Sequence, residues 1–262
     1  FGRIAAQNAK QVVVQRIREA ERGMVFEKFS SRENDIVTGI IQRMENKNVY
    51  IDLGKAEAIL TPNEQIPGEI YQYHDRMKTY IVEVKKTSKG PQIMVSRTHP
   101  GLLKRLFELE VPEIHDGLVE IKSVAREPGM RSKISVYTKD ENIDPVGACV
   151  GHKGMRVQTI VNELRGEKID IVKYSSEPDQ YVANALSPAK VVSTEVLEEE
   201  KICRVIVPDY QLSLAIGKEG QNARLAAKLT GWKIDIKSES QAAEEAEQGA
   251  QEVGVAYEAD KD

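Results

Sequence analysis

One unit of this 262-residue chain occurs twice, and this repeat restricts the fold more than any other feature of the sequence. Each copy carries Gly-x-x-Gly behind an aliphatic residue, first at Gly151–Gly154 and again at Gly217–Gly220. The letters Lys-Ile-Asp-Ile follow in both copies, starting at Lys168 and at Lys233. The offsets are 66 and 65 positions, too long for a solenoid repeat and suited to a small domain.

Strand patterns precede the glycine loop in each copy. Apolar and polar residues alternate over 118–124 and 133–137 in the first copy, and over 190–196 and 202–207 in the second. Such alternation predicts half-buried strands. The order helix, strand, strand, helix, loop, helix, strand is that of the bacterial-type (type II) KH domain. The sequence therefore predicts two KH domains in tandem, over 100–175 and 176–240.

The glycine loops are the candidate binding sites. Two glycines around two residues let the backbone approach a phosphodiester chain, and the helix that follows points its amides at the same place. KH domains clamp about four nucleotides with such a loop. An isolated Gly-x-x-Gly is more often an ordinary turn, but here its context occurs twice. The residues predicted to bind single-stranded RNA are Gly151, His152, Lys153, Gly154, Met155 and Arg156 in the first copy, and Gly217, Lys218, Glu219, Gly220, Gln221, Asn222 and Arg224 in the second.

We expect two kinds of residue around the loops, exposed cations and buried aliphatic side chains. Cationic side chains should contact phosphate, and Glu219 should weaken the second loop. Aliphatic neighbours should be buried. The expected phosphate contacts are Lys153, Arg156, Lys218 and Arg224, and the expected buried residues are Val150, Ile169, Ile216 and Ile234.

Short strands separated by turns over residues 31–99 predict an OB-type β-barrel. The segment resembles the S1 RNA-binding domain from Ile36–Ile41 to the final Val-Ser-Arg at 95–97. Tyr50 is predicted to face outward, where it either stacks on a base or is an ordinary surface tyrosine. The resemblance is incomplete, because Lys47 and Gln92 replace an aromatic and a basic residue, so weak RNA binding is expected here.

The two ends of the chain differ in character. Residues 1–30 have the spacing of a helix, which either packs on the barrel or ends an N-terminal domain that is otherwise missing; we favour the second. Residues 241–262 are acidic and of low complexity, so we expect a disordered tail. The whole chain has a net charge of −4, and residues 238–262 account for −7, which leaves +3 on the remainder. The acidity is therefore concentrated in the tail.

The sequence offers little for catalysis. Cys149 and Cys203 lie in apolar stretches, so we expect reduced, buried thiols and no zinc site. The four histidines are scattered, and no pattern for a catalytic group, a metal or a cofactor is present. No apolar run has the roughly 20 residues of a membrane span. The chain is expected to be a cytoplasmic, non-enzymatic, multidomain α+β protein.

The order helix, S1-type barrel and two KH domains resembles the NusA family of bacterial transcription elongation factors. Specific motifs carry this resemblance, and it covers residues 1 to about 237. They are Phe1–Gln7, Asp144–Arg156, Ala215–Ala226 and Thr230–Asp235. The resemblance implies binding to nascent RNA and to RNA polymerase, mainly through the missing N-terminal domain. It also implies effects on pausing, intrinsic termination and antitermination, with other antitermination factors as further partners.

Two other classes of protein combine similar modules. An exoribonuclease of the polynucleotide phosphorylase type has KH and S1 domains in the opposite order, behind catalytic domains that have no counterpart here. A ribosome-associated protein would be more basic. An RNA-binding accessory module of either class stays the alternative, and an assay for RNA phosphorolysis or hydrolysis would distinguish the first.

Overall fold

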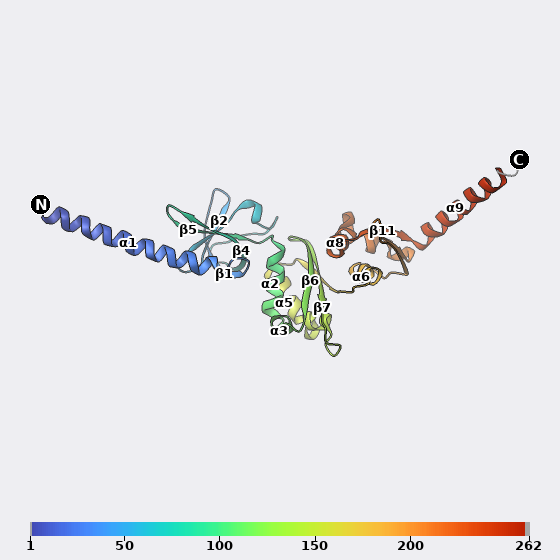
Figure 1. Cartoon of the computed structure of the whole chain (residues 1–262), viewed down its shortest axis with the longest axis horizontal. Coiled ribbons are helices and arrows are strands. Elements are labelled where there is room, and N and C mark those ends of the chain that lie inside the picture. Colours follow the sequence, from blue (N-terminus) through green and yellow to red (C-terminus); the bar gives the residue numbers. More distant parts are fainter. Residues whose placement is uncertain (1, 260–262) are drawn as a thin grey trace. The chain divides into compact units, whose positions relative to one another are not determined.

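The computed structural model describes residues 2–259, with side chains described from Gly2 to Gln251. The chain divides into two compact units. One comprises Phe1–Glu110 and Thr159–Gly166, and the other comprises Val111–Gln158 and Glu167–Asp262. Figure 1 shows the elements of both.

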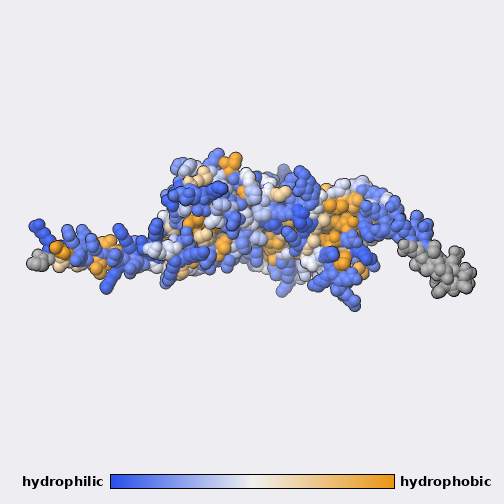
Figure 2. Space-filling view, turned by 90° about the horizontal axis from the view of Figure 1, so that it is seen from above, coloured by the Kyte–Doolittle hydropathy of each residue, from blue (hydrophilic) through white to orange (hydrophobic). Residues whose placement is uncertain are grey.

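Helix α1 (Gly2–Ser30) begins the first unit, which confirms the predicted N-terminal helix. Only its last turns pack against the barrel. Phe29 is 2% exposed within the barrel core, and Val25 and Phe26 lie against the same core. The earlier turns are exposed, and the left arm of Figure 2 shows hydrophobic residues among hydrophilic ones.

A closed five-stranded barrel follows α1, as the sequence predicts. Its strands pair in the order β1-β2-β3-β5-β4, with β3 and β5 parallel. Ile41, Ile51 and Ile81 are fully buried at its centre. Gly39 is required in β1, because a Cβ there would lie 2.4 Å from the Ile51 side chain. The strands are β1 (Ile36–Glu45), β2 (Asn48–Asp52), β3 (Glu57–Leu60), β4 (Arg76–Thr87) and β5 (Gly90–Ser96).

The barrel ends in a buried ion pair. Arg97 is 0% exposed and donates to both carboxylate oxygens of Glu69, at 3.0 and 3.1 Å, and to the carbonyl of Lys78. Its guanidinium also reaches the carbonyl of Glu163 in α5. The arginine of the Val-Ser-Arg run is therefore structural.

The two KH domains have the predicted element order. Each contains a three-stranded sheet with one antiparallel and one parallel pairing, β6-β7-β8 in the first and β9-β10-β11 in the second. The first comprises α2 (Pro100–Glu110), α3 (Pro112–His115), β6 (Glu120–Glu127), β7 (Arg131–Tyr137), α4 (Pro145–Val150), α5 (Met155–Glu163) and β8 (Lys168–Lys173). The second comprises α6 (Pro178–Ala185), β9 (Ser193–Leu197), β10 (Ile202–Val207), α7 (Leu212–Ile216), α8 (Gln221–Thr230) and β11 (Lys233–Ser238).

One hydrophobic core joins the two KH domains within the second unit. Helix α8 of the second domain packs on β6 and β7 of the first. Ala125 and Val172 of the first domain belong to the same buried cluster as Leu225 and Ala226 of the second. The Tyr181 hydroxyl, in α6, adds a 2.7 Å hydrogen bond to Ser135 Oγ in β7. The two domains are thus parts of one packed body.

The prediction of a disordered tail is wrong for the described residues, because helix α9 spans Glu239–Ala259. A capping box starts it: Gln241 N donates to Ser238 Oγ at 3.2 Å, and Ser238 N donates to Gln241 Oε1 at 3.1 Å. Ser240 N also donates to Asp209. The alanine and glutamate residues that follow are strong helix formers, and low sequence complexity hid this capping signal. Residues 260–262 lie outside the described part.

Among the described residues, no helix has both the length and the apolar character that a bilayer requires.

Candidate nucleic-acid interface

The two glycine loops have nearly the same backbone conformation. Gly151 has φ and ψ of 77° and 174°, and Gly217 has 78° and 170°. Lys153 and Glu219 each occupy the left-handed region, at 52° and 29° and at 56° and 26°. In each loop the amide of the second glycine donates to the carbonyl of the first at 3.1 Å. The duplication is therefore one of geometry as well as of sequence.

The first glycine of each loop is required by packing. A Cβ on Gly151 would lie 2.6 Å from the side chain of Arg156, and a Cβ on Gly217 would lie 2.7 Å from the amide nitrogen of Asn222. Arg156 and Asn222 are the equivalent residues of the two helices that follow the loops. Both glycines also have a positive φ, a backbone conformation that is strained for a residue with a side chain.

The second glycine of each loop faces open space. A Cβ on Gly154 would meet nothing within 4 Å, and one on Gly220 would meet only the end of Arg224 at 3.9 Å. Packing therefore does not explain these glycines. Their positive φ, 73° in both, is what favours glycine at these positions. The open side leaves room for the backbone of a ligand, as an RNA clamp would require.

The residues that follow the loops hold them in place. Arg156 Nη1 donates to the carbonyl of Ala148 at 2.6 Å and pairs with Glu113 at 2.9 Å. Asn222 is buried, and its Nδ2 donates to the carbonyls of Ala215 and Leu186, at 2.9 and 3.0 Å. Both side chains thus tie the helix after the loop to the helix before it.

Arg224 links the second loop to the first KH domain. Its Nε and Nη2 reach Glu127 Oε1 at 2.7 and 2.6 Å, and its Nη1 donates to the carbonyl of Glu219 at 3.0 Å. A phosphate would have to compete with protein oxygens for Arg224, and likewise for Arg156. Their role as phosphate contacts stays a prediction. Neither carboxylate partner could be found from sequence spacing.

The other predicted contacts are exposed around the loops. His152, Lys153 and Met155 are exposed in the first copy, and Lys218 and Glu219 are exposed in the second. Gln221 is half-buried at the start of α8. The structure thus places all predicted loop residues at two equivalent positions of one body.

The predicted burial of four aliphatic neighbours is wrong. Ile216 is 38% exposed, and Val150, Ile169 and Ile234 are only half-buried. The fully buried residues are instead Cys149 and Ala215, one position earlier in α4 and α7. Each of these short helices turns its last residue outward before the glycine. Apolar surface therefore borders both loops.

Both cysteines are buried and free, as expected. Burial, assisted by the charge of Glu113, raises the pKa of the Cys149 thiol to about 12. Burial also raises the pKa of Cys203. Thiols of this kind are poor nucleophiles at neutral pH.

On the barrel, Tyr50 is half-buried, and the guanidinium group of Arg43 lies over its ring. The guanidinium carbon of Arg43 lies 4.2 Å from the ring centroid, and Arg43 also pairs with Glu57 at 2.9 Å. A base would therefore stack on Tyr50 beside a positive charge. Base stacking by Tyr50 stays a prediction.

Family models match consecutive parts of the chain. The NusA N-terminal domain matches residues 1–23, and the S1 RNA binding domain matches 30–96. The NusA-like first KH domain matches 97–174, and the NusA-like second KH domain matches 178–244.

Curated relatives match most of this chain. Each of the following is named transcription termination/antitermination protein NusA. The protein from Halalkalibacterium halodurans is 72% identical over 93% of this chain, and that from Bacillus subtilis is 71% identical over 93%. The chain spans 64% and 66% of the lengths of these two relatives. The protein from Mycobacterium bovis is 51% identical, and the match covers 92% of this chain and 72% of that protein. With this extent of identity and four consecutive domain matches, the chain belongs to the NusA family.

Proposed function

We propose that this chain binds single-stranded, nascent RNA through its two KH loops, with the S1 barrel as a weaker contact. The observation that carries the proposal is the pair of loops with one backbone conformation, held within one compact unit. A second glycine with no packing role in each loop leaves room for a phosphodiester backbone.

The surroundings of the loops suit an RNA strand. Lys153 and Lys218 supply exposed positive charge for phosphates. Ile216 and Val150 expose apolar surface beside the loops, against which unstacked bases can pack. Glu219 places a negative charge in the second loop, so we expect the second loop to contribute less than the first.

The wider function follows from family membership and is also proposed. Within a full-length member of the family, we expect this chain to act in the cytoplasm beside RNA polymerase, which is contacted mainly through the N-terminal domain. It modulates pausing, intrinsic termination and antitermination, in the last case with other antitermination factors. It acts by binding, without catalysis of its own, and the names of the relatives agree with this role.

The test places a negative charge where the phosphates should lie. The double variant Gly154→Asp/Gly220→Asp adds a carboxylate to the open side of both loops, at positions without steric conflict. We expect at least a tenfold loss of affinity for a fluorescein-labelled oligouridine, measured by anisotropy. Urea unfolding checks that the variant is folded.

Gly231→Asp is the matched control. Gly231 has φ +76 and no neighbour within 4 Å, but it lies at the far end of α8 from the second loop. This variant should bind RNA like the parent chain. A folded double variant with parental affinity would exclude the loops as the binding site.

A further inference from the structure

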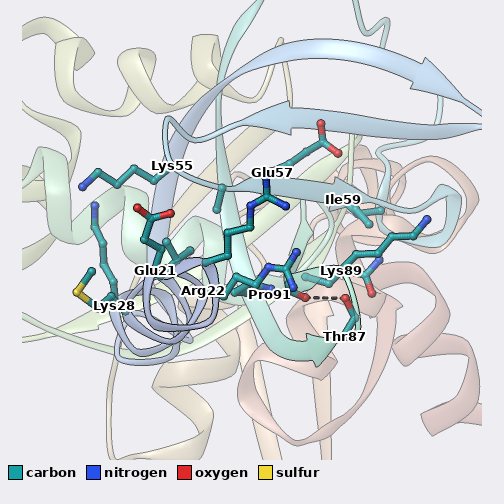
Figure 3. Close-up of a pocket in the computed structure, with 15 residues that line it drawn as sticks. Glu21, Arg22, Lys28, Lys55, Glu57, Ile59, Thr87, Lys89 and Pro91 are labelled. Carbon is teal, nitrogen blue, oxygen red and sulfur yellow. Dashed lines mark hydrogen bonds between the residues drawn. The ribbon is translucent and has the colours of Figure 1, made fainter. Parts of the chain in front are cut away.

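An open cleft of about 850 Å³ lies between α1 and the barrel, within the first unit. Helix α1 forms one wall, and β3 with the β4–β5 turn forms the other (Figure 3). The turn is held to α1, because Arg22 Nη1 donates to the carbonyl of Ser88 at 3.4 Å and the Arg22 side chain lies against Gly90. Lys86 lies over the Phe26 ring at 4.5 Å. The two walls are therefore fixed to each other.

The cleft is basic. Five cations line it, together with two carboxylates, Glu21 and Glu57, and Glu57 is already paired with Arg43 at 2.9 Å. Figure 3 shows Lys28 and Lys55 at one end and Lys89 at the other, with Arg22 between them. The cations are Arg18, Arg22, Lys28, Lys55 and Lys89.

Helical spacing explains the basic wall. Residues 18, 22, 25 and 28 are three or four positions apart, so they share one face of α1. Val25 of this face packs on the barrel core, which turns its cationic neighbours toward the cleft. Ile59 and Pro91 add apolar surface from the barrel. Cations over an apolar floor suit a nucleotide, whose phosphate is charged and whose base is not.

The cleft adjoins the outer face of the barrel that carries Tyr50. Tyr50 pairs directly with Ile59 across β2 and β3, and residues directly opposite each other point to the same side of a sheet. Ile59 lines the cleft. A strand of RNA on the Tyr50 face would thus continue against α1.

We propose that this cleft binds the sugar-phosphate backbone of single-stranded RNA, so that α1 forms part of the RNA-binding surface. The inference rests on the proposed RNA-binding function. It assigns a ligand to cationic residues of α1 that lie outside the matched S1 segment. It also compensates for the aromatic and basic residues that the barrel lacks at Lys47 and Gln92.

The test removes three exposed cations of the cleft, in the variant Arg18→Gln/Lys28→Gln/Lys55→Gln. The control, Arg3→Gln/Lys10→Gln/Arg16→Gln, removes three exposed cations of α1 that do not line the cleft. Arg22 is kept because it holds the turn. Oligouridine affinity is measured over a range of salt concentrations. For single strands, three lost phosphate contacts should reduce the slope of log K against log salt by about 2.

The same measurement in the Gly154→Asp/Gly220→Asp background separates the two proposals. A reduced slope for the cleft variant alone, in either background, supports the cleft. Equal changes in cleft and control variants would show an effect of net charge only and would overturn it, as would no change in either. Failure of the KH proposal would appear separately, as parental affinity of the double glycine variant.

Discussion

Gly217 and Gly220 bracket the same loop, but only Gly217 has neighbouring atoms close enough to exclude a side chain. Gly217 lies against the backbone and Cβ of Asn222, which is itself buried and hydrogen-bonded. Gly220 has open space beside it. Both have a positive φ, but Gly217 combines it with a ψ of 170°, a region open almost only to glycine, whereas Gly220 lies in the left-handed helical region at a ψ of 13°. Gly217 is therefore more restricted in both its backbone conformation and its packing.

The first prediction compares alanine at these two positions. Gly220→Ala should cost about 1–2 kcal/mol, the penalty for a left-handed residue with a side chain. Gly217→Ala should cost roughly 2 kcal/mol more, because Asn222 must also move. Urea unfolding of both variants measures the difference. Equal losses would show that Gly217 is required only for its φ.

The Lys-Ile-Asp-Ile run recurs in β8 and β11, but its aspartate has different partners in the two strands. Asp170 accepts from Arg131 Nε at 2.7 Å and from Lys133 Nζ at 2.9 Å, and Lys133 also donates to the carbonyl of Ser187 at 2.7 Å. Asp235 lies 45% exposed, 3.9 Å from Lys237. Asp170 therefore lies near the contact with the second KH domain, through Lys133, whereas Asp235 is exposed to solvent.

The second prediction concerns acid stability. Burial raises the pKa of Asp170, but hydrogen bonds from Arg131 and the charge of Lys133 outweigh it and hold this pKa below its usual value. A lowered folded-state pKa stabilises the fold above the unfolded pKa of about 3.9, and this stabilisation is lost as the pH falls through the folded value.

Asp170→Asn should therefore cost roughly 3 kcal/mol in the free energy of unfolding at neutral pH, since Lys133 is fully buried. The free energy of unfolding of this variant should also fall less steeply below about pH 4 than that of the parent chain. Asp235→Asn is the control and should cost less than about 1 kcal/mol. Urea titrations from neutral to acid pH test both. Similar profiles for the two variants would contradict the assigned role of Asp170.

Elements with a periodic pattern were predictable from the sequence, and contacts between distant elements were not. Alternation predicts that Tyr50 faces outward, and its neighbours Val49 and Ile51 are indeed buried inside the barrel. The same approach failed at Ile216, because a five-residue helix such as α7 is too short for periodicity to fix its inner face. The partners of Arg224 and Arg156 depend on tertiary packing, so no local spacing reveals them. The cleft between α1 and the barrel depends on tertiary packing in the same way, because its two walls lie far apart in the sequence.

At the scale of the whole molecule, the second unit holds both glycine loops, and a buried cluster crosses from one KH domain to the other. Leu225 in α8 is fully buried in the cluster that also contains Ala125 of β6. Arg224, beside it, bonds Glu127 at the end of β6. Because α8 of the second KH domain packs on β6 and β7 of the first, we expect the two domains to unfold together.

The third prediction tests this cooperativity. Leu225→Ala should destabilise the unit by about 2–5 kcal/mol and speed amide exchange in β7 of the first KH domain as well as in β10 of the second. Leu214→Ala, the same change at a residue 42% exposed, should have little effect. Hydrogen exchange followed by mass spectrometry makes the measurement. Unchanged exchange in β7 would mean that the two domains open independently.

The shared core also has a kinetic consequence for RNA release. Once one loop holds a strand, the other loop meets the same strand at an effective concentration fixed by packed side chains, without the entropy of a flexible linker. A strand that leaves one loop should thus be recaptured before it leaves the second. Residence time should therefore rise steeply once the RNA is long enough to reach both loops, while the association rate changes little.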